Sequence, residues 1–179
     1  MTPDVIRSDL KGIIKMKKVG IVMGSDSDLP VVQKAVAILK QLEIPYEAHV
    51  YSAHRTPLQA ADFARDAAGN GFGVIIAAAG MAAHLGGVIA SYTVLPVIGI
   101  PCKGPVFDGM DALLATVQMP SGIPVATVAV NAGANAALLA AQILAVEDKA
   151  LTKKLMALRQ EGAAAVISKD EGIMARLEE

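Results

Sequence analysis

The chain has 179 residues, the length of one globular domain that buries roughly 70% of the surface of its unfolded form. Its 16 Lys and Arg residues are balanced by 17 Asp and Glu residues, and it has three Tyr, three Phe and no Trp. A basic surface and a set of stacking aromatic rings are therefore both missing, which excludes the usual nucleic-acid-binding classes.

The single cysteine, Cys102, excludes a disulfide framework and a cysteine-based zinc site, and it favours a reducing, cytoplasmic location. It follows a proline, and the one charge beside it is Lys103, so we expect it to pack rather than to act as a nucleophile. The His, Cys, Asp and Glu residues form no metal-ligand spacing. We expect no metal.

The beginning of the chain mixes charges with one hydrophobic pair, which is too weak for a signal peptide. We expect residues 1–16 to be a disordered extension, residues 17–170 to form a single domain, and residues 171–179 to be a flexible tail.

Two long stretches, residues 67–102 and 112–146, contain no charged side chain. Proline, glycine and polar residues interrupt both, so neither contains a clean apolar span of the roughly 20 residues that a membrane helix needs. Helices at residues 82–91 and 134–146 would be apolar on nearly all sides, which indicates burial on more than one face. We expect no membrane partner, and we expect a homo-oligomer.

Strand and helix patterns alternate along the chain. Short Val- and Ile-rich runs that end at turn residues predict buried strands at residues 18–23, 47–51, 74–78, 94–100 and 125–130. Helical patterns follow them at residues 29–42, 57–69, 82–91, 108–118 and 134–146, with a charged, frayed helix at 149–160. This alternation predicts an α/β fold: three α/β/α layers with a doubly wound, parallel, five-stranded sheet of flavodoxin-like order and an extra C-terminal helix.

The first strand is followed by Gly24-Ser25-Asp26-Ser27-Asp28. Backbone N–H groups at the start of the next helix would suit an anion such as phosphate. The same residues also suit a plain helix cap, in which Ser27 caps and Asp28 complements the dipole. Walker and GxGxxG patterns are both absent here.

The second strand is followed by Ser52-Ala53-His54-Arg55-Thr56-Pro57. The guanidinium of Arg55 offers a fork of donors for a phosphate. The imidazole of His54 can give and take a proton near neutral pH. Since parallel strands end at one edge of the sheet, these groups should converge with the Ser25 loop.

The third strand is followed by Gly80-Met81-Ala82-Ala83-His84. The small residues Gly80 and Ala82 would let backbone amides approach a ligand closely. His84 fits either a ligand contact or a half-buried structural role. His49 lies inside the second strand, and we expect it to be structural.

These motifs, together with Val117-Gln118-Met119-Pro120, Gly122-Ile123-Pro124 and residues 135–144, resemble the bacterial-type N5-carboxyaminoimidazole ribonucleotide mutases of purine biosynthesis. The resemblance covers residues 18–159. A related CO2-using carboxylase continues its Ser-Ala-His with Lys-Gly-Pro and lacks Ala-Ala-His, so Arg55 and His84 favour the mutase. Two departures are Gly86, where the family usually has proline, and a shorter motif around Asn131.

The resemblance implies transfer of a carboxylate from nitrogen to carbon on an imidazole ribonucleotide, in the cytoplasm, without a cofactor or metal. It makes His54 the general acid and base, with Ser25, Asp28 and Arg55 on the phosphate and ribose. The other residues expected at the substrate are Ser52, Gly80, Ala82 and His84. The implied assembly is an octamer.

Three alternatives stand beside this interpretation. The nearest is an aminoimidazole ribonucleotide carboxylase that uses CO2 directly. A flavodoxin-like nucleotide-binding module without catalysis would need aromatic side chains around a flavin ring, and the loops after the strands offer almost none. A phosphoacceptor receiver domain would need an aspartate at the end of the third strand, where Ala77-Ala78-Ala79 stand.

Overall fold

The computed structural model describes residues 16–178. The extension expected at residues 1–16 therefore lies outside the described residues, apart from Met16, which packs against the core.

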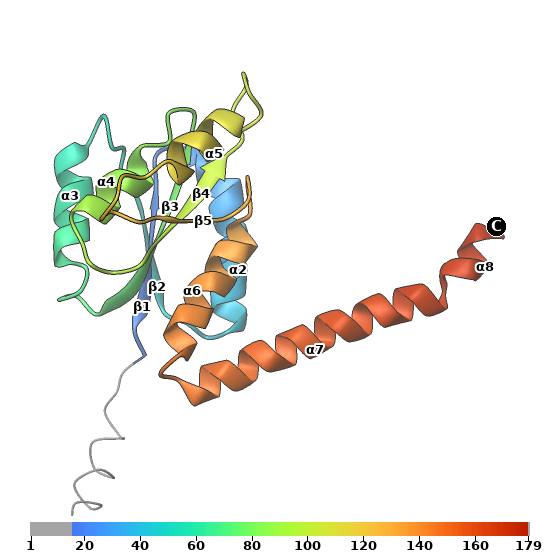
Figure 1. Ribbon diagram of the computed structural model, residues 1–179. Coiled ribbons are helices and arrows are strands. Elements are labelled where there is room, and N and C mark those ends of the chain that lie inside the picture. Colours follow the sequence, from blue (N-terminus) through green and yellow to red (C-terminus); the bar gives the residue numbers. More distant parts are fainter. Residues whose placement is uncertain (1–15, 179) are drawn as a thin grey trace, which may run out of the picture.

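The described chain forms one sheet of five parallel strands in the order β2-β1-β3-β4-β5 (Figure 1). This is the flavodoxin-like order that the alternating pattern predicts, and it is confirmed. The strands are β1 (Lys18–Met23), β2 (Tyr46–Val50), β3 (Phe72–Gly80), β4 (Val97–Cys102) and β5 (Ala126–Thr127). The chain reverses its winding direction between β1 and β3, which in such sheets opens a crevice at the carboxyl ends of the strands.

Helices cover both faces of the sheet, so the three-layer prediction is also confirmed. Helices α2 (Leu29–Gln41) and α6 (Gly133–Ala145) lie on one face, and α3 (Pro57–Asp66) and α4 (Leu85–Ser91) lie on the other (Figure 1). The short helix η1 (Asp26–Asp28) precedes α2, and α5 (Met110–Val117) packs against β4.

Helices α2 and α6 pack very closely because small residues line their contact. Ala136, Ala137 and Ala140 of α6 are fully buried. At the start of α6, a Cβ on Gly133 would lie 2.1 Å from the carbonyl oxygen of Val31. This packing accounts for much of the charge-free stretch at residues 112–146 within a single subunit. In the part of the chain that the structure describes, none of the helices has both the length and the apolar character needed to cross a membrane.

The fifth strand is shorter than the expected residues 125–130. Its ladder with β4 ends early at Pro101, which lies inside β4. The N–H of Val128 donates to the carbonyl oxygen of Gly99 at 3.1 Å, but Pro101 has no N–H to return the next bond. The chain then continues as a loop to α6.

The C-terminal helix is longer than expected. Instead of ending near residue 160, α7 runs over Lys149–Glu171 and extends away from the body of the domain (Figure 1). Residues of the expected flexible tail form the short helix α8 (Ile173–Leu177).

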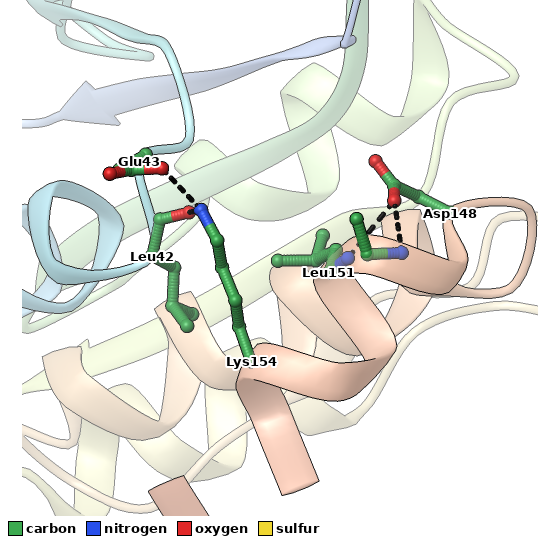
Figure 2. A network of polar contacts seen from close by, with 6 residues as sticks. Leu42, Glu43, Asp148, Leu151 and Lys154 are labelled. Carbon is green, nitrogen blue, oxygen red and sulfur yellow. Dashed lines mark hydrogen bonds and ion pairs between the residues drawn. The ribbon is translucent and has the colours of Figure 1, made fainter. Parts of the chain in front are cut away.

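The base of α7 is held by polar contacts. The Asp148 carboxylate accepts the backbone N–H groups of Ala150 and Leu151, each at 2.9 Å (Figure 2). The ammonium of Lys154 donates to the carbonyl oxygen of Leu42 at 3.2 Å and pairs with Glu43 (Figure 2). Leu151 is the buried side chain of this helix, and most of the rest of α7 is exposed.

Candidate active site

A pocket of about 510 Å3 opens at the carboxyl edge of the sheet, between the loops that follow β1, β2, β3 and β4. All of the residues that the sequence placed at the substrate line this one pocket: Ser25, Asp28, Ser52, His54, Arg55, Gly80, Ala82 and His84. A larger hollow of about 990 Å3 lies elsewhere, around Tyr92 and Ile123. Neither a histidine nor a carboxylate lines that larger hollow, so the smaller, polar pocket is the candidate site.

The loop after β1 forms a capping box. The hydroxyl of Ser25 accepts the N–H of Ser27 at 3.3 Å, and the carboxylate of Asp28 accepts the N–H of Ser25 at 3.2 Å. Ser25 is therefore the helix cap, and the assignment of that role to Ser27 was wrong. The reason is that the η1 turn begins at Asp26, two residues earlier than a cap at Ser27 would place it.

The carboxyl group of Asp28 is half-buried beside Cys102. Burial raises the pKa of Asp28 above its ordinary value of 3.8, while hydrogen bonds from Ser25 and Cys102 oppose the shift. Burial, assisted by the nearby charge of Asp28, raises the pKa of the Cys102 thiol to about 12. A thiol with this pKa is protonated at neutral pH, which agrees with the packing role expected for Cys102.

The loop after β2 is held by its own hydroxyl groups. The Ser52 hydroxyl accepts the backbone N–H groups of His54 at 3.3 Å and Arg55 at 3.2 Å. The Thr56 hydroxyl accepts the backbone N–H of Ser52 and donates to the carbonyl oxygen of Ser52. The guanidinium of Arg55 donates to the carbonyl oxygen of Gly24 at 3.1 Å. Arg55 thereby ties the second loop to the first and brings a positive charge beside the helix start.

Two histidines from loops 30 residues apart meet in this pocket. Nε2 of His54 lies 2.8 Å from Nδ1 of His84, and the two rings are nearly perpendicular, at 77°. A hydrogen bond of this kind requires that one of the two nitrogens carries a proton and the other does not. The third histidine, His49, lies outside the pocket, where it bonds to Glu47 at 2.9 Å and stacks on Tyr51.

The turn that carries His84 has an unusual backbone. Met81 and Ala83 both have left-handed backbone angles, with φ of 54° and 45°. Non-glycine residues seldom adopt this region, and doing so costs conformational energy. At Gly80, a Cβ would lie 3.3 Å from the carbonyl oxygen of Cys102, so glycine fits the close approach between β3 and β4 there.

Comparison with known proteins gives a consistent family. The family model described as AIR carboxylase matches residues 18–165. The N5-carboxyaminoimidazole ribonucleotide mutase of Pyrococcus horikoshii is 55% identical over 147 residues, which cover 80% of this chain and 83% of that protein.

The phosphoribosylaminoimidazole carboxylase of Saccharomyces cerevisiae is 52% identical over 82% of this chain, which spans 26% of that longer protein. The crystal structure of Treponema denticola PurE superimposes with a TM-score of 0.77 at 30% identity, covering 86% of this chain and 96% of that one.

The chain belongs to the AIR carboxylase family. Membership in an enzyme family removes the alternative of a flavodoxin-like module without catalysis. It also fits the pocket, which two histidines and an arginine line.

The loop after β4 adds pocket residues that the sequence analysis missed as site residues, namely Lys103, Gly104 and Pro105. The ammonium of Lys103 pairs with Asp108 at 2.9 Å, and its backbone N–H donates to Asn131 at 2.9 Å. The signal was available, because Lys103 directly follows a strand as the other site residues do. Among residues 16–178, no three His, Cys, Asp or Glu side chains are grouped in a way that could hold a metal ion.

Proposed function

We propose that this enzyme converts N5-carboxyaminoimidazole ribonucleotide into 4-carboxy-5-aminoimidazole ribonucleotide in purine biosynthesis. The observation that carries the proposal is the hydrogen-bonded pair of His54 and His84 in the same pocket as the Ser25 and Arg55 loops. The pair supplies proton transfer, and the two loops supply groups for a phosphorylated sugar.

In the proposed complex, the phosphate binds near the guanidinium of Arg55 and the hydroxyl of Ser25. A guanidinium that is already fixed by the Gly24 carbonyl loses little further freedom when it binds an anion. The carboxylate of Asp28 would repel a phosphate, so its proposed partner is a ribose hydroxyl. Ser52 lines the pocket, and its hydroxyl keeps the Arg55 loop in place.

The reaction needs one proton delivered and one removed. The carbamate C–N bond breaks, CO2 forms, and the nitrogen keeps the electron pair and accepts a proton from His54. The ring carbon then attacks the CO2 to form the C–C bond, and its proton returns to His54. The histidine ends in its starting state, so no external acid, base or cofactor is consumed.

His84 and the turn before it have a supporting role in this scheme. Through the 2.8 Å contact, His84 fixes the orientation of the His54 ring in the free enzyme. The turn at Gly80, Met81 and Ala82 borders the carboxylate position, where water must be excluded for CO2 to be recaptured.

The alternative is a carboxylase that takes aminoimidazole ribonucleotide and CO2 directly. The yeast relative, which is named a phosphoribosylaminoimidazole carboxylase, is the reason to test it. The deciding assay follows the carboxylated imidazole from either precursor, with and without bicarbonate, in the presence of EDTA. We expect rapid conversion of the N5-carboxy compound without bicarbonate. Faster product formation from aminoimidazole ribonucleotide and bicarbonate would favour the carboxylase, and activity lost to EDTA and restored by a divalent cation would contradict a metal-free mechanism.

The proposal includes a cytoplasmic homo-oligomer, with the octamer that the family resemblance implies. Two features support assembly. Helix α7 extends from the body with Val166 and Ile167 exposed, and the α5 region exposes Phe107, Met110 and Leu114 at helical spacing. Light scattering at micromolar concentration tests it: a mass near that of one 18.4 kDa chain would contradict assembly, whereas a dimer or tetramer would correct the count.

A further inference from the structure

The side chain of Met81 crosses from one pocket loop to the next. Strands β3 and β4 are neighbours, and Gly80 pairs with Cys102 where both strands end. Met81 follows on one side and Gly104 lies on the other. The Cγ atom of Met81 is 3.7 Å from the position that a Cβ on Gly104 would take, so the methionine lies directly against the Gly104 loop at the pocket.

Methionine is a costly residue at this position. Its φ of 54° is left-handed, a conformation that glycine adopts freely and methionine does not. The residue is 59% exposed, so burial in the core does not offset this cost. Neither backbone preference nor core packing therefore accounts for a methionine at position 81. The feature of its surroundings that is left to explain it is the pocket that it lines.

We propose that Met81 retains the CO2 released during the reaction by closing the gap between the Gly80 and Gly104 loops. The inference rests on the proposed mutase function. A thioether side chain is apolar and adaptable in shape, so it can seal an irregular gap against water and does not bind CO2 tightly. An open gap would let CO2 exchange with the solvent before the ring carbon captures it.

The test measures loss of label from the carboxylated imidazole. Product labelled with 13C in its carboxyl group is incubated with the full-length enzyme in buffer containing unlabelled bicarbonate. The quantity compared is the label lost per interconversion of the two carboxylated ribonucleotides. The C-carboxylate is the practical starting compound, because a carbamate loses CO2 readily without an enzyme.

Three variants separate the side chain from the backbone. Met81→Gly removes the side chain and relieves the strain, Met81→Ala removes the side chain and keeps the strain, and Met81→Leu keeps an apolar side chain of similar size. Glu43→Gly is the matched control, because Glu43 also has a left-handed φ, of 58°, and does not line the pocket.

We expect label loss per interconversion to rise about tenfold in Met81→Gly and in Met81→Ala, and to stay within about twofold in Met81→Leu and Glu43→Gly. Stability should follow another order, with Met81→Gly unfolding at a higher urea concentration than Met81→Ala. Wild-type retention of label in Met81→Ala would overturn the proposal for Met81 and leave the mutase function intact. Loss of all label at each interconversion by the wild-type enzyme, after subtraction of the label that the free carbamate loses without enzyme, would instead overturn the mutase function and the retention role with it.

Discussion

Replacing His54 by asparagine tests the centre of the proposed mechanism. The substitution keeps a polar side chain of smaller size, but the amide ends about where Nδ1 of the imidazole lies. It falls roughly 2 Å short of the position of Nε2, beyond hydrogen-bond reach of His84. The variant therefore loses both the proton donor and the 2.8 Å contact in one change.

The expected magnitude follows from the two proton transfers assigned to His54. General acid–base catalysis typically contributes about 10²–10⁴ in rate, equivalent to roughly 3–5 kcal/mol in the activation barrier. Since one group serves both transfers, we expect kcat to fall by at least about 10²-fold, the smaller value of that range. Affinity for the product nucleotide should change by less than about tenfold, because the proposed phosphate contacts belong to Ser25 and Arg55.

Steady-state turnover and calorimetry with the product nucleotide measure the two quantities separately. His49→Asn is the matched control, since it makes the same chemical change at a histidine outside the pocket. The control should keep kcat within about threefold of the wild-type value. Turnover of His54→Asn above about a tenth of wild type would remove His54 from the mechanism, and an equal loss in both variants would mean that the effect is structural.

Four further predictions concern neighbouring groups. Arg55→Lys should weaken product binding by about 1–3 kcal/mol in calorimetry, since lysine keeps the charge but loses the fork, and an unchanged Kd would place Arg55 outside the phosphate site. Because burial raises the pKa of Asp28, its stabilising contribution is present below its ordinary pKa of 3.8 and is lost as pH rises through the folded-state value. Asp28→Asn should therefore raise the urea midpoint more at pH 7 than at pH 4 while weakening nucleotide binding, and an equal change at both pH values would contradict the assignment. Gly86→Pro, at the second position of α4, should increase the free energy of unfolding by about 0.4–1 kcal/mol, and a loss of stability would show that the backbone there rejects proline. Cys102, whose pKa is about 12, should resist iodoacetamide at pH 7.5 in the folded enzyme and react after unfolding in urea, whereas rapid native labelling would contradict its buried, protonated state.

The amino-acid sequence by itself determined the layers of the fold and predicted which residues line the candidate pocket. Short apolar runs that alternate with amphipathic helices predict a parallel sheet covered by helices on both faces. Parallel strands bring their carboxyl ends to a common edge of that sheet. Ser25, His54 and Ala82 each follow a strand, so their convergence in one pocket could be predicted from strand ends alone. Lys103 follows the same rule and could have been included.

Only the tertiary structure decided how these groups engage one another. The contact between His54 and His84 depends on the register of β3 beside β1 and on the turn after β3, neither of which hydrophobic periodicity encodes. The left-handed backbone of Met81 is likewise invisible in the sequence, because methionine has no preference for that conformation. Periodicity reports which face of an element is buried, whereas distances across a pocket depend on backbone angles and on packing between segments far apart in the chain.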